Sequence, residues 1–309
     1  MNSKIPPVLM RADLPLPLFI RGKVRDSYNL GSHLLIVVTD RISAFDVVLP
    51  SGIPLKGHVL SRLSSFWFRR TSNIVPNHMA EAIDDVNSLD SYLPEENRFP
   101  YPSYLRGRSM VVKKAKRLPV ECVVRGYLAG TAWIEYQEHG TIGGEKMEAG
   151  LRESQKLPQE RFTPTTKSDA GHDEPLTKAQ IIRLVGLRIA QEMEQKSLAL
   201  YQFAMDFALS KGIIIADTKF EFGIDNGRLI LIDEVLTPDS SRFWDASQYR
   251  EGQSQPSFDK QPVRDWLVAS GWNKEPPAPA LPPDVIQATS QRYILAYEKL
   301  TGRKLAILE

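Results

Sequence analysis

The 309-residue sequence contains only one cysteine, Cys122, so an internal disulfide framework is excluded. A single cysteine is also typical of a reducing compartment. Long apolar runs are missing too, since none reaches the length that crosses a bilayer. Prolines and charges interrupt the apolar N-terminal residues before the core of a signal peptide can form. We therefore expect a cytoplasmic protein without a membrane segment.

The sequence has no marked excess of either charge. Its formal net charge is +2 at pH 7, its sequence pI is about 8.5, and no long run of lysine and arginine occurs. This pattern does not indicate a nucleic acid partner, but it is compatible with anionic small molecules bound in one cleft. With 42% hydrophobic and 25% charged residues, the chain can form one large domain or two medium ones.

Several common ligand motifs are also absent. No segment matches a Walker loop or the GxGxxG pattern of dinucleotide-binding proteins. The five histidines lack the spacing of a zinc site. Cys122 has no activating pattern beside it, and we interpret it as a core residue of a strand.

Periodicity and turn residues predict both helices and strands. Helices are expected at residues 55–70, 177–211, 262–270 and 284–300, and strands at 33–38, 109–115, 120–125, 213–223 and 229–236. Residues 39–46, 73–107 and 140–175 are interpreted as loops. The long helix begins with a capping box at Thr177 and Gln180, and we expect a break near Gly186 or Ser197. This mixture predicts an α+β fold with a β-rich N-terminal part and a helix-covered C-terminal part.

The most informative segment is the predicted strand from Ile215 to Gly223 (IADTKFEFG). Residues two apart face the same way in a strand, so Asp217, Lys219 and Glu221 share one face. Burying three unpaired ionisable groups is costly. These side chains are therefore solvated, neutralise one another, or are organised around a ligand.

A second carboxylate pair, Asp233 and Glu234, follows four apolar residues in the next predicted strand. Carboxylates that converge across a hairpin suit Mg²⁺ shared with phosphates. Asn226-Gly227 predicts the hairpin turn itself. A two-residue turn places Asp233 opposite the face of Glu221, whereas a three-residue turn with a bulge brings it to the same face. The sequence leaves both arrangements open.

Two further segments admit both a structural and a functional interpretation. The residues from Arg21 to Asp26 form a charged turn, or a glycine turn that brings backbone amides and Lys23 to nucleotide phosphates. Arg125, at the end of a predicted strand, closes that strand at the surface or binds phosphate through two nitrogens. A second arginine, Arg242, lies just after the carboxylate pair and favours a cleft.

These segments, taken together, resemble the SAICAR synthase family. The two signature segments of that family resemble Leu118–Thr131 (LPVECVVRGYLAGT) and Ile215–Gly223, with Thr131 in place of the usual serine. The likeness extends through GKVRD, SAFD, KSDAGHDE and DEVLTPDSSRFWD, and so covers nearly the whole chain. The length and the segment QPSFDKQPVRDWL resemble the longer, yeast-type members.

The resemblance implies a fold and a reaction. The fold is a kinase-like nucleotide fold, divided here into a β-rich ATP-binding domain at residues 1–117 and an α+β domain at 118–309 that carries the metal and ribonucleotide sites. The reaction joins L-aspartate to carboxyaminoimidazole ribonucleotide (CAIR) with ATP and Mg²⁺, and yields SAICAR, ADP and phosphate through an acyl phosphate. This is a ligase reaction of purine biosynthesis. The alternatives are another ATP-dependent kinase or ligase, or a regulatory module without turnover.

The resemblance also implies roles for individual residues. ATP is expected at Gly22, Lys23, Arg25, Lys113 and Leu118. The ribonucleotide is expected at Arg125, Thr131, Lys219 and Arg242, and Mg²⁺ at Glu221 and Asp233. Catalysis is assigned to Asp217, Lys219, Glu221 and Asp233. Aspartate is expected at Ser43, Asp46, Asp169, His172 and Asp239.

Overall fold

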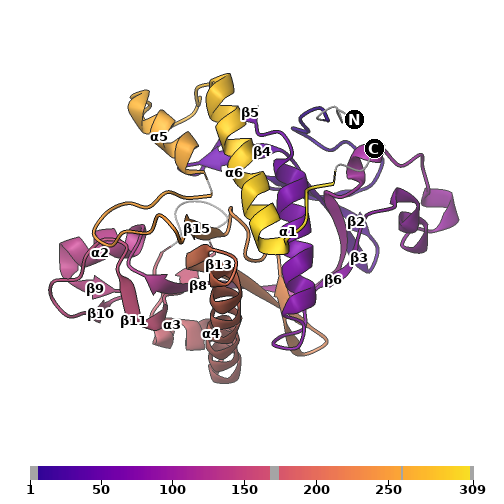
Figure 1. Cartoon of the computed structure of the whole chain (residues 1–309). Coiled ribbons are helices and arrows are strands. Elements are labelled where there is room, and N and C mark those ends of the chain that lie inside the picture. The colour runs from indigo at the N-terminus through magenta and orange to yellow at the C-terminus, as the bar shows by residue number, and fades with distance from the viewer. Residues whose placement is uncertain (1–5, 168–173, 259, 307–309) are drawn as a thin grey trace. The chain divides into compact units, whose positions relative to one another are not determined.

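The computed structural model describes residues 6–167, 174–258 and 260–306 (Figure 1). These residues form two compact units. The first unit comprises residues up to Phe66, His78–Lys114 and Phe258 onwards, and the second comprises Trp67–Asn77 and Ala115–Ser257. The first unit thus contains both ends of the described chain, whereas the sequence analysis placed a single boundary at 117/118. No helix in the described ranges is long and apolar enough to span a membrane.

The first unit is built on an antiparallel sheet of five strands. Its strands lie in the order β1 (Leu18–Arg21), β2 (Arg25–Leu30), β3 (His33–Val38), β7 (Ser109–Lys113) and β6 (Met79–Ala82). The alternate side chains of Leu35 and Val37 are fully buried and pack with Val111 of β7. Three short 3-10 helices follow, at Val86–Ser91, Glu95–Asn97 and Ser103–Leu105. The first adds Val86 and Leu89 to the same core, and the third adds Leu105.

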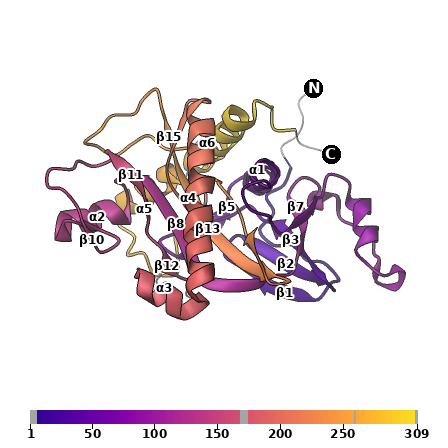
Figure 2. The ribbon, with the colours of Figure 1, turned by 90° about the horizontal axis from the view of Figure 1, so that it is seen from below.

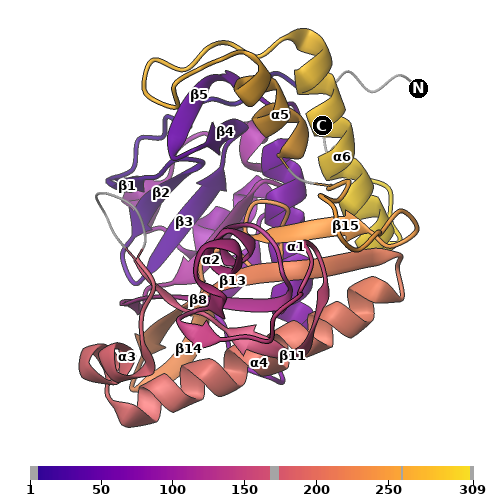
Figure 3. The same ribbon diagram turned by 90° about the vertical axis from the view of Figure 1, so that its left-hand side faces the viewer.

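A separate hairpin in the first unit packs against helices from the C-terminal part of the chain. The hairpin consists of β4 (Arg41–Ala44) and β5 (Val47–Gly52), and the helices are α5 (Gln261–Ala269) and α6 (Pro283–Thr301). Figure 3 shows this hairpin beside α5. Ile42 and Leu49 of the hairpin form one apolar cluster with Val263 and Leu267 of α5. Helix α1 (Lys56–Arg70) buries Val59, Leu60 and Leu63.

The second unit contains a larger antiparallel sheet. Its central strands are β8 (Lys116–Tyr127) and β13 (Ile213–Asp225), which pair with each other. Strands β11 (Lys156–Phe162) and β12 (Thr165–Thr166) pair with β8, and β14 (Arg228–Ile232) and β15 (Ser241–Asp245) pair with β13. Helix α2 (Thr131–His139) follows β8 and leads into a small hairpin of β9 (Thr141–Ile142) and β10 (Glu145–Lys146).

One face of this sheet is covered by helix α4 (Leu187–Leu209), which follows α3 (Lys178–Val185) (Figure 2). Phe220 and Phe222 of β13 are fully buried, as expected for the face opposite to the charged residues. Burial of each such ring stabilises the fold by about 1.5–3 kcal/mol. The hydroxyl of Tyr201 on α4 donates a hydrogen bond of 2.6 Å to the carbonyl of Ile215. The apolar face is therefore fixed to the helix, and the charged face is left for other contacts.

The structure confirms the predicted capping box and hairpin and decides where the long helix breaks. Thr177 and Gln180 cap α3 reciprocally, and the break lies at Gly186, while Ser197 is buried within α4. Three loop predictions were wrong in part. Residues 39–46 contain β4, residues 73–107 contain β6, and residues 140–175 contain β9 to β12. These strands have only two to seven residues, and most are too short to show a period of two.

Candidate active site

The pairing of β8 with β13 brings charged residues together on one face of the second unit's sheet. Asp217 pairs with Arg125, Lys219 with Val123 and Glu221 with Glu121. Because side chains two apart point the same way, both strands contribute to one charged surface. The predicted shared face of Asp217, Lys219 and Glu221 is confirmed, and its charges are neutralised mainly by partners on other segments.

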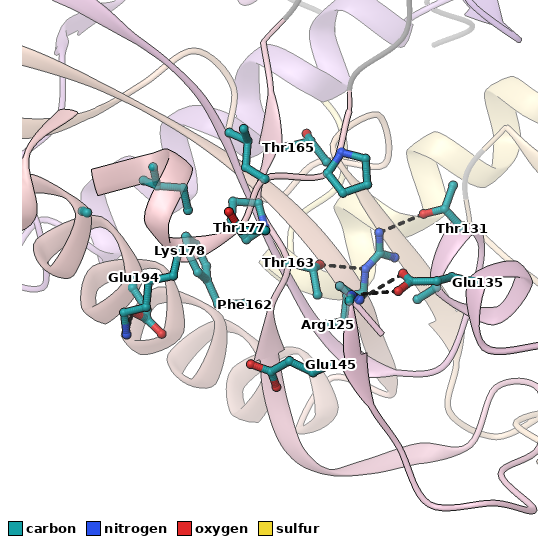
Figure 4. Close-up of a pocket in the computed structure, with 18 of the residues that line it drawn as sticks. Arg125, Thr131, Glu135, Glu145, Phe162, Thr163, Thr165, Thr177, Lys178 and Glu194 are labelled. Atoms are coloured by element: carbon teal, nitrogen blue, oxygen red, sulfur yellow. Dashed lines mark hydrogen bonds and ion pairs between the residues drawn. The ribbon is translucent and has the colours of Figure 1, made fainter. Parts of the chain in front are cut away.

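Arg125 is buried, and each of its three side-chain nitrogens donates a hydrogen bond. Figure 4 shows the bonds to Thr163 and Thr131. Its Nη1 donates to Asp217 Oδ2 at 2.8 Å, its Nε to Thr163 Oγ1 at 3.0 Å and its Nη2 to Thr131 Oγ1 at 3.0 Å. Burial lowers the pKa of Arg125 despite the opposing charge of Asp217. The guanidinium is therefore held in a fixed orientation at the start of α2, where Thr131 is the first helical residue.

Arg242 approaches the same carboxylate from β15. It lies opposite Asp217 in the strand register, and its Nη1 donates to Asp217 Oδ2. About a third of the Arg242 side chain is exposed, unlike that of Arg125. Gly130 lies directly against the Arg242 guanidinium, because a Cβ at Gly130 would be 2.2 Å from Arg242 Nη2. Asp217 thus holds two arginines side by side, and one of them remains accessible.

A second charged group lies further along the same two strands. The ammonium of Lys219 donates to Glu121 Oε1 at 2.7 Å, and that of Lys167 donates to the same oxygen at 2.8 Å. Lys167 also donates to Glu221 Oε1. Burial alone would raise the pKa of Glu121, but the two ammonium groups lower it. The result is a chain of alternating charges from Lys219 through Glu121 and Lys167 to Glu221.

Glu221 and Asp233 are close enough for their charges to interact. The turn contains two residues, since Asp225 pairs with Arg228, and Glu221 therefore lies opposite Ile232. An extended Asp233 would point to the other face, but β14 ends at Ile232 and Asp233 has a positive φ of 68°. The positive φ of Asp233, rather than a bulge in the hairpin, therefore turns this residue towards Glu221. Burial and the charge of Asp233 raise the pKa of Glu221 to about 7.

This arrangement fits a divalent cation. Glu221 is buried and Asp233 is half-buried. Two such neighbouring carboxylates favour the addition of positive charge, and their oxygens are the donors that Mg²⁺ prefers. Burial alone would lower the pKa of Lys167, but the charges of Glu221, Asp233 and Glu121 raise it. Within the described ranges, no group of three or more histidine, cysteine, aspartate or glutamate side chains is arranged to hold a metal. Two carboxylate ligands leave coordination positions of Mg²⁺ for phosphate oxygens, which suits a metal shared with phosphates.

The candidate nucleotide residues belong mostly to the first unit. Gly22 and Lys23 form the turn between β1 and β2, which the Gly22 N–H closes by donating to the Arg25 carbonyl at 2.8 Å. The guanidinium of Arg41 donates to the carbonyls of both Gly22 and Lys23 and so fixes this turn. Lys23 forms an ion pair of 2.6 Å with Asp46, and both side chains are about half exposed.

The other candidates lie on several different elements. Lys113 is exposed at the end of β7, whereas Leu118 is buried in β8 of the second unit. Ser43 is half-buried on β4, and Asp239 is half-buried in the turn before β15. Asp169 and His172 lie outside the described residues.

Sequence reasoning missed three residues of the site: Glu121, Lys167 and Thr163. Glu121 had a recognisable signal, because it alternates with Val123 and Arg125 along one strand. Thr163 had none, since it comes from the segment interpreted as a loop. Lys167 lies in the same segment, and its signal was its place at the start of KSDAGHDE, a part of the family likeness to which no role was assigned. Cys122 is fully buried and burial raises the pKa of its thiol, in agreement with its interpretation as a core residue.

Arg125 and Thr131 also line a cavity of about 600 Å³ within the second unit (Figure 4). The other walls come from α2, the turn of the β9–β10 hairpin, the segment after β11, and the start of α3 and α4. Glu135 anchors that hairpin to α2 by accepting hydrogen bonds from the N–H groups of Gly143 and Gly144. Burial alone would raise the pKa of Glu135, but these bonds and the Thr141 hydroxyl lower it. The arginine pair is therefore bordered by a firmly attached wall.

Known proteins resemble this chain along nearly its full length. The family model described as SAICAR synthetase matches residues 18–279. A phosphoribosylaminoimidazole-succinocarboxamide synthase from Syntrophotalea carbinolica is 52% identical over 301 residues, which cover 96% of this chain and 99% of that protein.

Two solved structures are also similar. The SAICAR synthase from Saccharomyces cerevisiae complexed with SAICAR has a TM-score of 0.87 and 47% identity, and the match covers 96% of this chain and 99% of that one. A SAICAR synthetase in complex with ADP has a TM-score of 0.67, covers 93% of this chain and 99% of that one, and shares the fold at 23% identity. The predicted α+β fold and the likeness to the yeast-type form are thereby confirmed. The chain belongs to the SAICAR synthetase family.

Proposed function

We propose that this chain is an ATP-dependent ligase that joins L-aspartate to CAIR and forms SAICAR, ADP and phosphate in purine biosynthesis. A relative named for this activity is about half identical over nearly the whole chain, and the yeast relative is described as complexed with SAICAR. The observation that carries the proposal is the charged face of the second unit. There Arg125 of β8 and Arg242 of β15 share Asp217 of β13. Further along β8 and β13, Glu121 and Glu221 are bonded by Lys219 and Lys167.

The arginine pair suits the phosphate of the ribonucleotide. Arg242 is partly exposed and presents its guanidinium beside Gly130, at the start of α2. A helix N-terminus favours an anion because its first N–H groups have no partner within the helix. In this assignment Arg242 and Thr131 contact the phosphate, and Asp217 and Arg125 orient them. Arg125 adds positive charge although its own nitrogens are engaged.

The carboxylate of CAIR is assigned to Lys219. Its ammonium lies between the arginine pair and Glu221 along β13, and it is about one third exposed. Glu221 and Asp233 are the groups that would hold Mg²⁺. When bound, that ion would neutralise negative charge on the phosphates during transfer. The protein residues supply fixed charges around the carboxylate that reacts.

The reaction proceeds in two balanced steps in this proposal. A carboxylate oxygen of CAIR forms a bond to the γ-phosphorus of ATP, and ADP leaves with the bridging oxygen. The amine of aspartate then attacks the acyl carbon, a proton leaves the nitrogen, and phosphate departs. Transfer of a phosphoryl group depends on position and charge neutralisation more than on a protein nucleophile. In this proposal Arg125 and Arg242 serve position, through the ribonucleotide phosphate, and Lys219 serves charge neutralisation at the reacting carboxylate.

The remaining assignments rest on the family likeness. ATP is assigned to Gly22, Lys23, Arg25, Lys113 and Leu118, and the turn fixed by Arg41 supports this for Gly22 and Lys23. Aspartate is assigned to Ser43, Asp46, Asp169, His172 and Asp239. A cytoplasmic location is proposed from the single cysteine, which is typical of a reducing compartment.

Omission of one substrate at a time tests the proposed reaction. ADP release is measured with ATP and Mg²⁺, in the presence of aspartate, CAIR or both. We expect sustained release only with both, together with one SAICAR per ADP. Release that continues on CAIR alone would favour the alternative of a kinase. No release under any of these conditions would favour a module without turnover.

A further inference from the structure

Glu121 and Glu221 differ in the number of ammonium groups that donate hydrogen bonds to them. Glu121 accepts from two ammonium groups, those of Lys219 and Lys167. Glu221 shares only Lys167 with it and has the like charge of Asp233 nearby. Among the described residues, Lys167 hydrogen-bonds both glutamates, and its charge also interacts with that of Asp233. Lys167 is therefore a cation that compensates the Glu221 and Asp233 pair.

Lys167 is placed to leave Glu221 without losing its hydrogen bonding. Its ammonium touches Glu221 Oε1 and, at 2.8 Å, Glu121 Oε1. The two glutamates lie directly opposite each other on β13 and β8, so a small movement transfers the ammonium to Glu121 alone. About a fifth of the Lys167 side chain is exposed, whereas both glutamate side chains are buried. The ammonium therefore has an alternative partner, and part of the Lys167 side chain is open to solvent.

We propose that Lys167 is the resident counter-ion of the divalent-metal site, and that metal binding displaces its ammonium from Glu221 to Glu121. This inference rests on the proposed metal site at Glu221 and Asp233. A divalent cation and an ammonium at one carboxylate repel each other, and the repulsion is strong where water is largely excluded. Lys167 thus sets the metal affinity: it stabilises the metal-free pair and weakens the binding of the ion that replaces it.

Binding of Mn²⁺ to the full chain, measured by the loss of the free-ion spin-resonance signal, tests this exchange without any turnover. Lys167→Met removes the charge and keeps the length of the side chain. We expect its Kd for Mn²⁺ to fall at least about tenfold, which corresponds to about 1.4 kcal/mol. Its Tm without metal is expected to fall and to recover with Mn²⁺. Lys167→Gln serves the same purpose if the methionine variant does not fold.

Two further variants make the result specific. Lys178→Met removes an exposed lysine that pairs with Glu194 at 3.3 Å, and its Kd is expected to equal that of the wild type. Glu221→Gln is expected to abolish the binding. Unchanged or weaker Mn²⁺ binding by the Lys167 variants, with the Glu221 dependence intact, would overturn the exchange alone. Binding that does not depend on Glu221 would overturn both the exchange and the metal assignment.

Discussion

Asp217 and Arg125 lie opposite each other on β13 and β8, and Arg125 Nη1 donates to Asp217 Oδ2 at 2.8 Å. The same carboxylate oxygen accepts from Arg242 on β15. Asp217 is thus an anion that both guanidinium groups, from the two neighbouring strands, share. Because Asp217 is buried, water cannot take over its role of compensating the two guanidinium charges. Asp217 orders the arginine pair that we assign to the ribonucleotide phosphate.

Asp217→Asn is expected to destabilise the fold and weaken ribonucleotide binding. Removing one partner of a buried ion pair leaves the other charge uncompensated and costs about 3–5 kcal/mol. We expect a fall of that size in the free energy of unfolding in urea, with a raised KM for CAIR. Asp13→Asn is the control, because Asp13 is largely exposed and pairs with Arg11 at 3.4 Å. A change below about 1 kcal/mol is expected there. Equal effects of the two variants would contradict the assigned role.

Gly130→Ala is expected to displace Arg242. Its Cβ would lie 2.2 Å from Arg242 Nη2, and Gly130 has φ 58° and ψ −133°, which disfavour any residue with a side chain. The expected result is a KM for CAIR raised about tenfold or more, while the KM for ATP changes little. Steady-state kinetics with each substrate varied in turn provide the measurement.

Gly186→Ala separates the displacement of Arg242 from backbone strain. Gly186 also precedes a helix and has φ 82° and ψ 155°, but no atom lies within 4 Å of a Cβ placed there. We expect a similar loss of stability, of about 1–3 kcal/mol, without the effect on CAIR. If both variants raise the KM for CAIR equally, Gly130 has no specific relation to the substrate.

The stability of the metal-free protein is expected to depend on Glu221 between pH 4.5 and about 7. The pKa of Glu221 is raised from 4.5 to about 7, so in this range the folded state binds more protons than the unfolded state. The free energy of unfolding therefore falls as pH rises through this window. Glu221→Gln has no such titration, so its free energy of unfolding does not fall in this way. From pH 4.5 to 7, the difference in unfolding free energy between the variant and the wild type is expected to shift in favour of the variant by on the order of 1–3 kcal/mol. Urea unfolding in chelator across pH 4 to 8 measures the difference. Parallel curves for the two proteins would rule out this charge effect.

Helix α5 is expected to contribute to the core of the first unit. Leu267 is 1% exposed and belongs to the cluster with Ile42 and Leu49, whereas the adjacent Val268 is 63% exposed. Leu267→Ala is expected to cost about 2–5 kcal/mol of unfolding free energy. Val268→Ala is expected to cost less than about 0.5 kcal/mol. Thermal and urea unfolding of both variants provide the comparison, and equal costs would mean that α5 adds nothing to this core.

The sequence was informative where the relevant geometry is local. A period of two placed Asp217, Lys219 and Glu221 on one face, because that period is a property of any strand. The orientation of Asp233 was not local in this sense. It depended on the turn length and on a positive φ at a residue other than glycine, which no pattern indicates.

Contacts distant in sequence could not be predicted from the residues alone. Lys167 reaches Glu221 across 54 positions because β12, a strand of two residues, pairs with β8 beside Glu121. A strand of that length has no period to detect. The two arginines were predicted to line a cleft. That Asp217 is their common partner became clear only from the register of β8, β13 and β15.

The most direct test of the account is turnover by Asp233→Ala. ADP release with ATP, Mg²⁺, aspartate and CAIR is compared with that of the wild type, with circular dichroism as a check of folding. Removal of one such charged group is expected to lower kcat at least about 100-fold while the protein stays folded. A folded Asp233→Ala protein with near-normal turnover in Mg²⁺ would contradict the assignment of the metal to the Glu221 and Asp233 pair.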